Sequence, residues 1–126
     1  MSDLATSPVR RSLLIVEDEA MIAMMLEEYI DALGHEVHGV ASTIAEASDM
    51  VRGGGFDFAI LDCYLNGEEI WPVAEMLDRE GIAFILSSGG ALSDVPEAYA
   101  RRPMLPKPYT MGAIADVLAA VDVAGD

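Results

Sequence analysis

Five short apolar runs constrain the fold of this chain more than any other feature of its sequence. Each run is too short to make a stable helix, and the longer ones are rich in β-branched or aromatic residues, which suits strands buried on both faces of a parallel sheet. The runs cover Ser12–Glu17, His35–Ala41, Phe56–Asp62, Ile82–Ser87 and Met104–Pro106. We therefore predict five strands.

Between these runs, apolar residues recur at every third or fourth position, which predicts amphipathic helices. The expected helices are Glu19–Leu33, Thr43–Arg52, Glu68–Glu80, Leu92–Arg101 and Thr110–Val123. Ser42 is expected to cap the second helix and Gly34 to close the first, whereas Pro96 makes the fourth short or irregular. Alternating strands and helices predict an α/β fold, in which helices cover both faces of a five-stranded parallel sheet.

The chain has 126 residues, which is enough for one compact domain. We expect this domain to span 12–123, with a flexible tail over 1–11 and a frayed end over 124–126. No apolar run approaches the ~18 residues of a membrane span, and the first residues lack the apolar segment of a secretory signal. A net charge of −15 argues against binding to nucleic acid or to an anionic membrane, and the single cysteine fits a reducing, cytoplasmic location.

Acidic residues stand at the carboxyl ends of two predicted strands. Glu17 and Asp18 end the first run, and Asp62 ends the third. If these strands are neighbours, the three carboxylates converge, and two such charges about 4 Å apart repel by roughly 4 kcal/mol at an effective dielectric near 20. Oxygen ligands of this kind suit Mg²⁺, with Mn²⁺ as the alternative. The competing interpretation is that solvated acids simply end the strands of an acidic protein.

Two further polar residues fall at the ends of the remaining strands. Ser88 follows the fourth run, beside Gly89-Gly90, and Lys107 follows the fifth run between two prolines. Lys107 is the only lysine in the chain. A lysine ammonium is a mobile point charge that can pair with a carboxylate or with a phosphoryl group placed on one. Acids, a hydroxyl and a lone lysine at different strand ends together indicate a specific site.

The segments LLIVEDEAMI, FAILDCYLNGEE, FILSSGG and LPKPY resemble the receiver domain of two-component response regulators, and the resemblance extends from about Ser12 to Val123. It implies a flavodoxin-like, doubly wound sheet with strand order 2-1-3-4-5. FILSSGG is similar in part to an alphaproteobacterial variant, often found as stand-alone receivers that work with kinases of the HWE type. A stand-alone switch is therefore expected, with a sensor histidine kinase or histidine phosphotransfer protein as donor and a downstream protein as partner.

The same resemblance implies a role for each candidate site residue. Asp62 would be the phosphoacceptor, and Mg²⁺ would be held by the side chains of Glu17, Asp18 and Asp62 together with the main-chain carbonyl of Tyr64. Ser88 would be the switch hydroxyl and Lys107 the lysine that contacts the phosphoryl group. These two side chains and Asp62 make up the catalytic set, which would also hydrolyse the aspartyl phosphate.

Two positions depart from the family pattern. Asn66-Gly67 follows Leu65 where a proline is common, and Met104 stands where the family has an aromatic residue that reports activation. Tyr99 or Tyr109 could take over that role, and we expect Tyr109 to act first as a side-chain anchor.

Other classes of protein remain as alternatives. The chain could be an adaptor that keeps the fold for docking and is not phosphorylated. A phosphatase of the haloacid dehalogenase type would need a second acid where Tyr64 stands. A flavodoxin-like cofactor protein is disfavoured because Glu17-Asp18-Glu19 would repel a phosphate.

A few remaining residues are given structural roles. We expect His35 to lie on the surface and Cys63 to be a small core residue. Met21, Met24 and Met25 are expected to pack in the core, with an adaptable docking face as the alternative.

Overall fold

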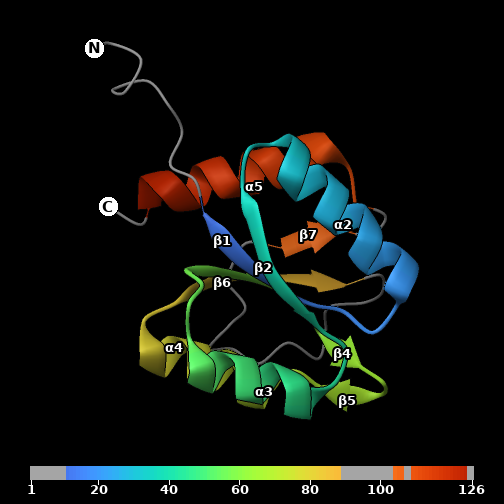
Figure 1. Cartoon of the computed structure of the whole chain (residues 1–126), viewed down its shortest axis with the longest axis vertical. Coiled ribbons are helices and arrows are strands. Elements are labelled where there is room, and N and C mark those ends of the chain that lie inside the picture. Colours follow the sequence, from blue (N-terminus) through green and yellow to red (C-terminus); the bar gives the residue numbers. More distant parts are fainter. Residues whose placement is uncertain (1–10, 89–103, 107–108, 125–126) are drawn as a thin grey trace.

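A five-stranded parallel sheet forms the centre of the molecule (Figure 1). The computed structural model describes residues 11–88, 104–106 and 109–124. Within them the sheet has the order β2-β1-β3-β6-β7, and every neighbouring pair is parallel. Its strands are β1 (Ser12–Val16), β2 (Glu36–Ala41), β3 (Phe58–Asp62), β6 (Ala83–Ser88) and β7 (Met104–Pro106). Taken in chain order, this is the predicted arrangement 2-1-3-4-5, which is confirmed.

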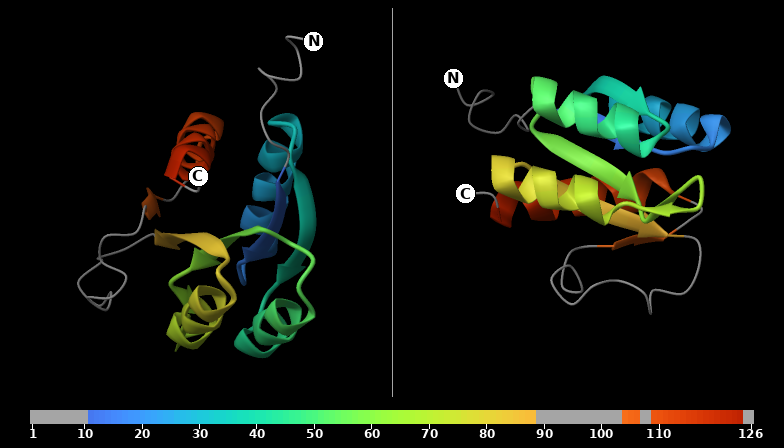
Figure 2. Two further views of the ribbon diagram at one scale, coloured as in Figure 1. Left: turned by 90° about the vertical axis from the view of Figure 1, so that its left-hand side faces the viewer. Right: turned by 90° about the horizontal axis from the view of Figure 1, so that it is seen from below.

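Four helices in the described residues cover the two faces of the sheet (Figure 2). One face carries α2 and α5, and the opposite face carries α3 and α4. The helices are α2 (Ala20–Ala32), α3 (Ile44–Gly53), α4 (Trp71–Glu80) and α5 (Met111–Ala124). The helix predicted over Leu92–Arg101 lies outside the described residues. No helix in the described part of the chain combines the length and apolar character needed to cross a bilayer.

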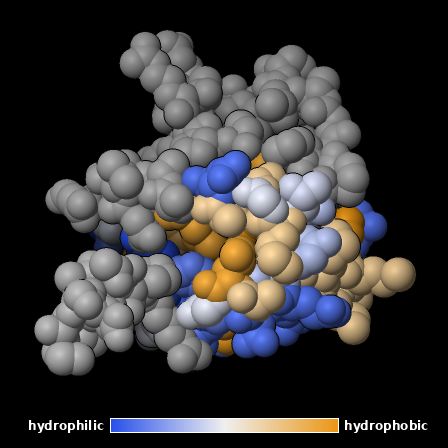
Figure 3. Space-filling model, turned by 90° about the horizontal axis from the view of Figure 1, so that it is seen from above, coloured by the Kyte–Doolittle hydropathy of each residue, from blue (hydrophilic) through white to orange (hydrophobic). Residues whose placement is uncertain are grey.

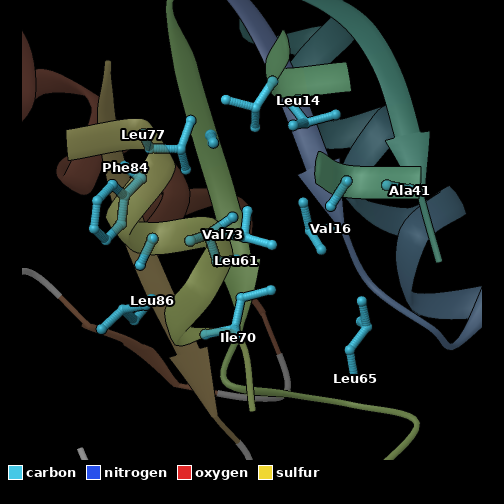
Figure 4. Close-up of a cluster of buried hydrophobic side chains, with 14 of the residues drawn as sticks. Leu14, Val16, Ala41, Leu61, Leu65, Ile70, Val73, Leu77, Phe84 and Leu86 are labelled. Carbon is cyan, nitrogen blue, oxygen red and sulfur yellow. The ribbon is translucent and has the colours of Figure 1, made fainter. Parts of the chain in front are cut away.

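Burial on both faces explains why the central strands β1 and β3 are almost continuous apolar runs. Successive side chains of a strand point to opposite faces. In β1, Leu14 and Val16 pack in the core cluster beneath α3 and α4, which Figure 4 shows. Leu13 and Ile15 pack in the other core cluster, beneath α2 and α5. From Leu13 to Val16 neither face of β1 meets water, so none of these four positions is polar.

A short antiparallel hairpin, absent from the sequence prediction, follows β3. Its strands β4 (Tyr64–Leu65) and β5 (Glu68–Glu69) are joined by Asn66 and Gly67. Both residues have positive φ, 52° and 81°, as a two-residue type I′ turn requires. The expectation that a helix begins at Glu68 is therefore wrong, since α4 begins at Trp71 with proline in its first turn.

The start of α3 also differs from the sequence prediction. The cap is Thr43, whose Oγ1 accepts a hydrogen bond from the N–H of Glu46 at 3.0 Å. Ser42, the predicted cap, instead donates its N–H and its hydroxyl to Oε1 of Glu46, at 2.8 and 2.9 Å. This is a capping-box arrangement shifted by one residue. The hydrogen bonds from Ser42, above all its backbone N–H, lower the pKa of the Glu46 carboxyl.

Three expectations about burial are wrong and two are confirmed. His35 is buried, and its Nδ1 accepts a hydrogen bond from the N–H of Arg11 at 3.0 Å at the start of the sheet. Met21 and Met24 are exposed on the outer side of α2. Cys63 is buried as predicted, and Met25 packs, as predicted, against the core cluster beneath α2 and α5. Seen from the side of α2 and α5, the described surface mixes apolar residues with strongly hydrophilic ones (Figure 3).

Candidate acidic site

Three carboxylates meet at the carboxyl-terminal edge of the sheet. Asp62 is the last residue of β3, and Glu17 and Asp18 directly follow β1, its parallel neighbour. Each side chain offers an oxygen, and these oxygens all lie within 4.8 Å of one another. Glu17 and Asp62 are only 2% and 7% exposed, and Asp18 is half-buried. The structure thus brings together the three acids that the strand-end argument expected to converge.

The backbone fixes Glu17 at the point where β1 becomes α2. Its N–H donates to the carbonyl of Ala41 at 3.0 Å, which continues the pairing of β1 with β2. Its Oε2 accepts the N–H of Glu19 at 3.2 Å, just before α2 begins. Glu17 is therefore held both by the sheet and by the start of the helix that follows.

Asp18 is held from the hairpin. Its Oδ2 accepts the N–H of Asn66 at 2.9 Å, and Asn66 donates its side-chain Nδ2–H to the carbonyl of Ser42 at 2.9 Å. In the sequence, Asn66 stands out only as a departure from the family pattern. Asn-Gly is the dipeptide that most favours a type I′ turn, so it could have predicted the hairpin that presents this N–H.

Asp62 lies between two neighbouring strands. It is paired in register with Ser87 of β6, and the N–H of Cys63 donates to the carbonyl of Ser87 at 3.0 Å. The carboxylate therefore stands at a strand end that is tied to β6 on one side and adjoins the end of β1 on the other.

The donor set fits a small divalent cation. Carboxylate oxygens are the ligands that Mg²⁺ prefers, and receiver domains generally bind this ion. Three like charges this close repel one another in a partly buried place, so a cation would relieve an unfavourable interaction. The main chain of Tyr64 lies in β4, two residues beyond Asp62. Its carbonyl remains a predicted ligand.

Two predicted site residues are placed only in part. Ser88 is the last residue of β6 and pairs with Pro106 of β7, so its backbone lies at the carboxyl-terminal edge of the sheet. Its side chain, like Lys107, lies outside the described part of the chain. The roles of both remain predictions.

Comparison with known proteins settles the family. The chain is similar to SdrG from Sphingomonas melonis Fr1, with 42% identity and a TM-score of 0.82, over 91% of this chain and 98% of that one. It belongs to the SdrG/PhyR group of response regulator receiver domains. SdrG has also been solved in a BeF3-activated conformation, with 44% identity and a TM-score of 0.77, over 87% of this chain and 94% of the other.

PhyR proteins are similar over shorter or partial stretches. PhyR from Methylorubrum extorquens is 50% identical over 46 residues, which is 36% of this chain and 15% of that protein. The response regulator PhyR from Brucella abortus is 26% identical with a TM-score of 0.75, over 93% of this chain but only 51% of its own length. The chain thus spans about half of that PhyR. No protein-family model matches the sequence.

These similarities confirm the predicted fold and family. The receiver fold indicates a role in two-component signalling, as a switch and not as a classical enzyme.

Proposed function

We propose that this receiver accepts a phosphoryl group on Asp62 in a Mg²⁺-dependent reaction and thereby switches its state. The observation that supports this most is the approach of the Glu17, Asp18 and Asp62 oxygens to within 4.8 Å at one edge of the sheet. The donor would be a histidine kinase or a histidine phosphotransfer protein, and the output would pass to a downstream protein.

In the transfer, an oxygen of the Asp62 carboxylate forms a bond to phosphorus. The phosphorus–nitrogen bond of the donor phosphohistidine breaks, and its electron pair leaves on the imidazole nitrogen. Glu17 and Asp18, with Asp62 and the Tyr64 carbonyl, would hold Mg²⁺, which when bound neutralises charge on the phosphoryl oxygens. The protein's main contribution is to keep the Asp62 oxygen in position for in-line attack.

Ser88 and Lys107 would complete the reactive site, and their roles are assigned from the sequence alone. The Ser88 hydroxyl would donate a hydrogen bond to one phosphoryl oxygen, and the Lys107 ammonium would pair with another. The aspartyl phosphate is a mixed anhydride, so water can attack its phosphorus, release inorganic phosphate and restore the carboxylate. The switch would therefore reset itself.

The principal alternative is an adaptor that docks without being phosphorylated. A docking module would gain nothing from three crowded carboxylates, which destabilise the fold unless a cation binds. The BeF3-activated conformation of the relative SdrG gives independent support, because BeF3⁻ bound to a carboxylate oxygen is tetrahedral at beryllium and resembles a phosphoryl group on that carboxylate.

The test is intact mass measurement after incubation with acetyl phosphate and Mg²⁺. Wild type should gain one phosphoryl group, and the gain should disappear when the metal is chelated. Asp62→Ala should gain none, whereas the matched control Asp57→Ala, at the other end of the same strand, should behave as wild type. An adduct that persists in Asp62→Ala would remove this residue as acceptor, and no adduct with any donor would favour the adaptor.

A further inference from the structure

A buried pair of hydroxyl groups lies beside the acidic site. The Ser87 Oγ and the Tyr109 hydroxyl oxygen are 2.5 Å apart, and either can donate the hydrogen bond. Ser87 is fully buried and Tyr109 is 4% exposed. Phenylalanine and alanine would fill these positions without any buried polar atom, so packing alone does not account for the pair.

Ser87 connects this pair to Asp62. The two residues are register partners across β3 and β6, and the carbonyl of Ser87 accepts the N–H of Cys63. A hydrogen bond that fixes the Ser87 side chain also limits the motion of its backbone. The last ladder contact of β3, at the end that presents Asp62, is made with that backbone.

Tyr109 connects the pair to α5. Its ring packs in the core cluster beneath α2 and α5, with Ile85 and Leu105. The next residue, Thr110, caps α5: its Oγ1 accepts the N–H of Ala113 at 3.1 Å, and its carbonyl accepts the N–H of Ile114 at 3.1 Å. The side chain of Tyr109 therefore links the start of α5 to the end of β6, where Ser87 is the register partner of Asp62.

We propose that Tyr109 is a positioning residue for the reaction at Asp62. Its hydroxyl holds Ser87, and Ser87 in turn fixes the Asp62–Cys63 end of β3 and ties it to the start of α5. This inference rests on the proposed function for the reactivity of Asp62. The fixing of the strand end can be tested without any ligand.

The first test is amide hydrogen exchange in Tyr109→Phe, which removes only the hydroxyl. The amide of Cys63 should exchange about fivefold faster relative to the amide of Ile60 in the middle of β3, because one hydrogen bond of ordinary strength is lost near it. The matched control is Tyr29→Phe, a half-buried tyrosine packed on the same core cluster whose hydroxyl makes no hydrogen bond within the described residues. It should leave the ratio unchanged. An unchanged ratio in Tyr109→Phe would overturn the proposal.

The second test measures the affinity for BeF3⁻ in saturating Mg²⁺, under conditions where every variant is fully folded. Tyr109→Phe and Ser87→Ala should each weaken this affinity about fivefold, and the double variant should be no weaker than either, because both changes remove the same hydrogen bond. A hydroxyl that only stabilises the fold would lower the unfolding midpoint and leave the affinity as in wild type, which would contradict the proposal.

The two tests separate the proposal from the function on which it rests. A wild-type chain that takes up no BeF3⁻ would overturn the proposed function, and the exchange ratio at Cys63 would still decide whether Tyr109 holds this strand end.

Discussion

Two aspartates stand at opposite ends of β3, one directly before the strand and one as its last residue, and their surroundings differ. Asp57, just before the strand, is exposed, and its Oδ1 accepts the N–H of Ser12 at 3.2 Å. Asp62, at the end of the strand, is buried beside Glu17 and Asp18. The same residue type is thus a solvated, hydrogen-bonded acid before the strand and one of three crowded charges at its end.

Parallel topology explains the difference. All five strands begin at one edge of the sheet and end at the other, so residues that follow neighbouring strands are brought together. At the starting edge, Asp57 meets the backbone of β1, and its own N–H donates to the carbonyl of Ser12 at 2.9 Å. At the carboxyl-terminal edge, Asp62 lies beside the acids that follow β1. An acidic composition alone therefore does not indicate a site. Several acids together at the carboxyl-terminal edge of the sheet do.

The largest effect is expected on Mg²⁺ binding, when the two acids beside Asp62 at the carboxyl-terminal edge of the sheet are neutralised. Glu17→Gln combined with Asp18→Asn should weaken Mg²⁺ binding on the order of a hundredfold, since two charges within a few ångströms of the cation disappear. Titration followed by the fluorescence of Trp71, the only tryptophan, or by calorimetry would measure it. The matched control, Glu68→Gln with Glu69→Gln, removes two exposed acids of the hairpin and should change the affinity less than about twofold. An unchanged affinity in the first variant would mean that the metal binds elsewhere.

The free energy of unfolding should respond strongly when Asp62 is neutralised and little when Asp57 is. Without Mg²⁺, Asp62→Asn should raise the free energy of unfolding by about 1–2 kcal/mol, because it relieves repulsion among crowded charges. Asp57→Asn should change it by less than about 0.5 kcal/mol, since asparagine keeps an oxygen for the Ser12 N–H. Urea unfolding measures both.

Magnesium should reverse the order of stability of wild type and Asp62→Asn. Wild type should gain about 2.7 kcal/mol at a concentration one hundred times the dissociation constant, and Asp62→Asn should gain much less. If Asp62→Asn were the less stable variant without metal, the crowding of the three acids would not be the dominant interaction at this edge.

A smaller effect is expected at the turn that holds Asp18. Asn66→Ala should destabilise the fold by about 1 kcal/mol, because alanine tolerates the positive φ poorly and the hydrogen bond to Ser42 is lost. Asn66→Gly relieves the backbone strain and loses only the side-chain bond, so it should be the milder change. Both should weaken Mg²⁺ binding a few-fold, by about half a kcal/mol to 1 kcal/mol. Equal affinity in both variants and wild type would show that Asp18 does not depend on the turn.

The smallest effect concerns Glu46, an exposed acid whose carboxylate, like that of Asp57, accepts hydrogen bonds. Its folded-state pKa is lowered from the ordinary value of 4.5 by the hydrogen bonds from Ser42. A lowered carboxyl pKa adds stability above the unfolded-state value, and this stability is lost as the pH falls through the folded-state value. The difference in unfolding free energy between wild type and Glu46→Gln should therefore be greatest above pH 4.5 and shrink below it. A difference independent of pH would contradict this assignment.

Sequence reasoning located the fold and the acids because both depend on regular patterns. Apolar runs fix which residues form buried strands, and parallel strands then place Glu17, Asp18 and Asp62 at one edge. The starts of helices and strands do not follow from such patterns, because hydrophobic periodicity does not distinguish a hairpin at Glu68 and Glu69 from the first turn of a helix.

The contacts that sequence reasoning missed are those between residues distant in the chain. Ser87 has the same strand phase as the buried Ile85, so its hydroxyl could have been expected to need a buried partner. The sequence does not specify that this partner is Tyr109, because that contact depends on how α5 packs. In the same way, the N–H of Asn66 reaches Asp18 only because the hairpin folds back toward β1 and β2.

The most direct test of the account is to locate the phosphoryl group chemically. Wild type would be incubated with acetyl phosphate and Mg²⁺, and the acyl phosphate would be reduced with borohydride, which converts the modified aspartate to homoserine. Peptide mass mapping should find homoserine in place of Asp62 and leave Asp57 and Asp18 unchanged. Homoserine at either of those positions, or modified protein with Asp62 intact, would contradict the claim that the crowded end of β3 is the reactive one.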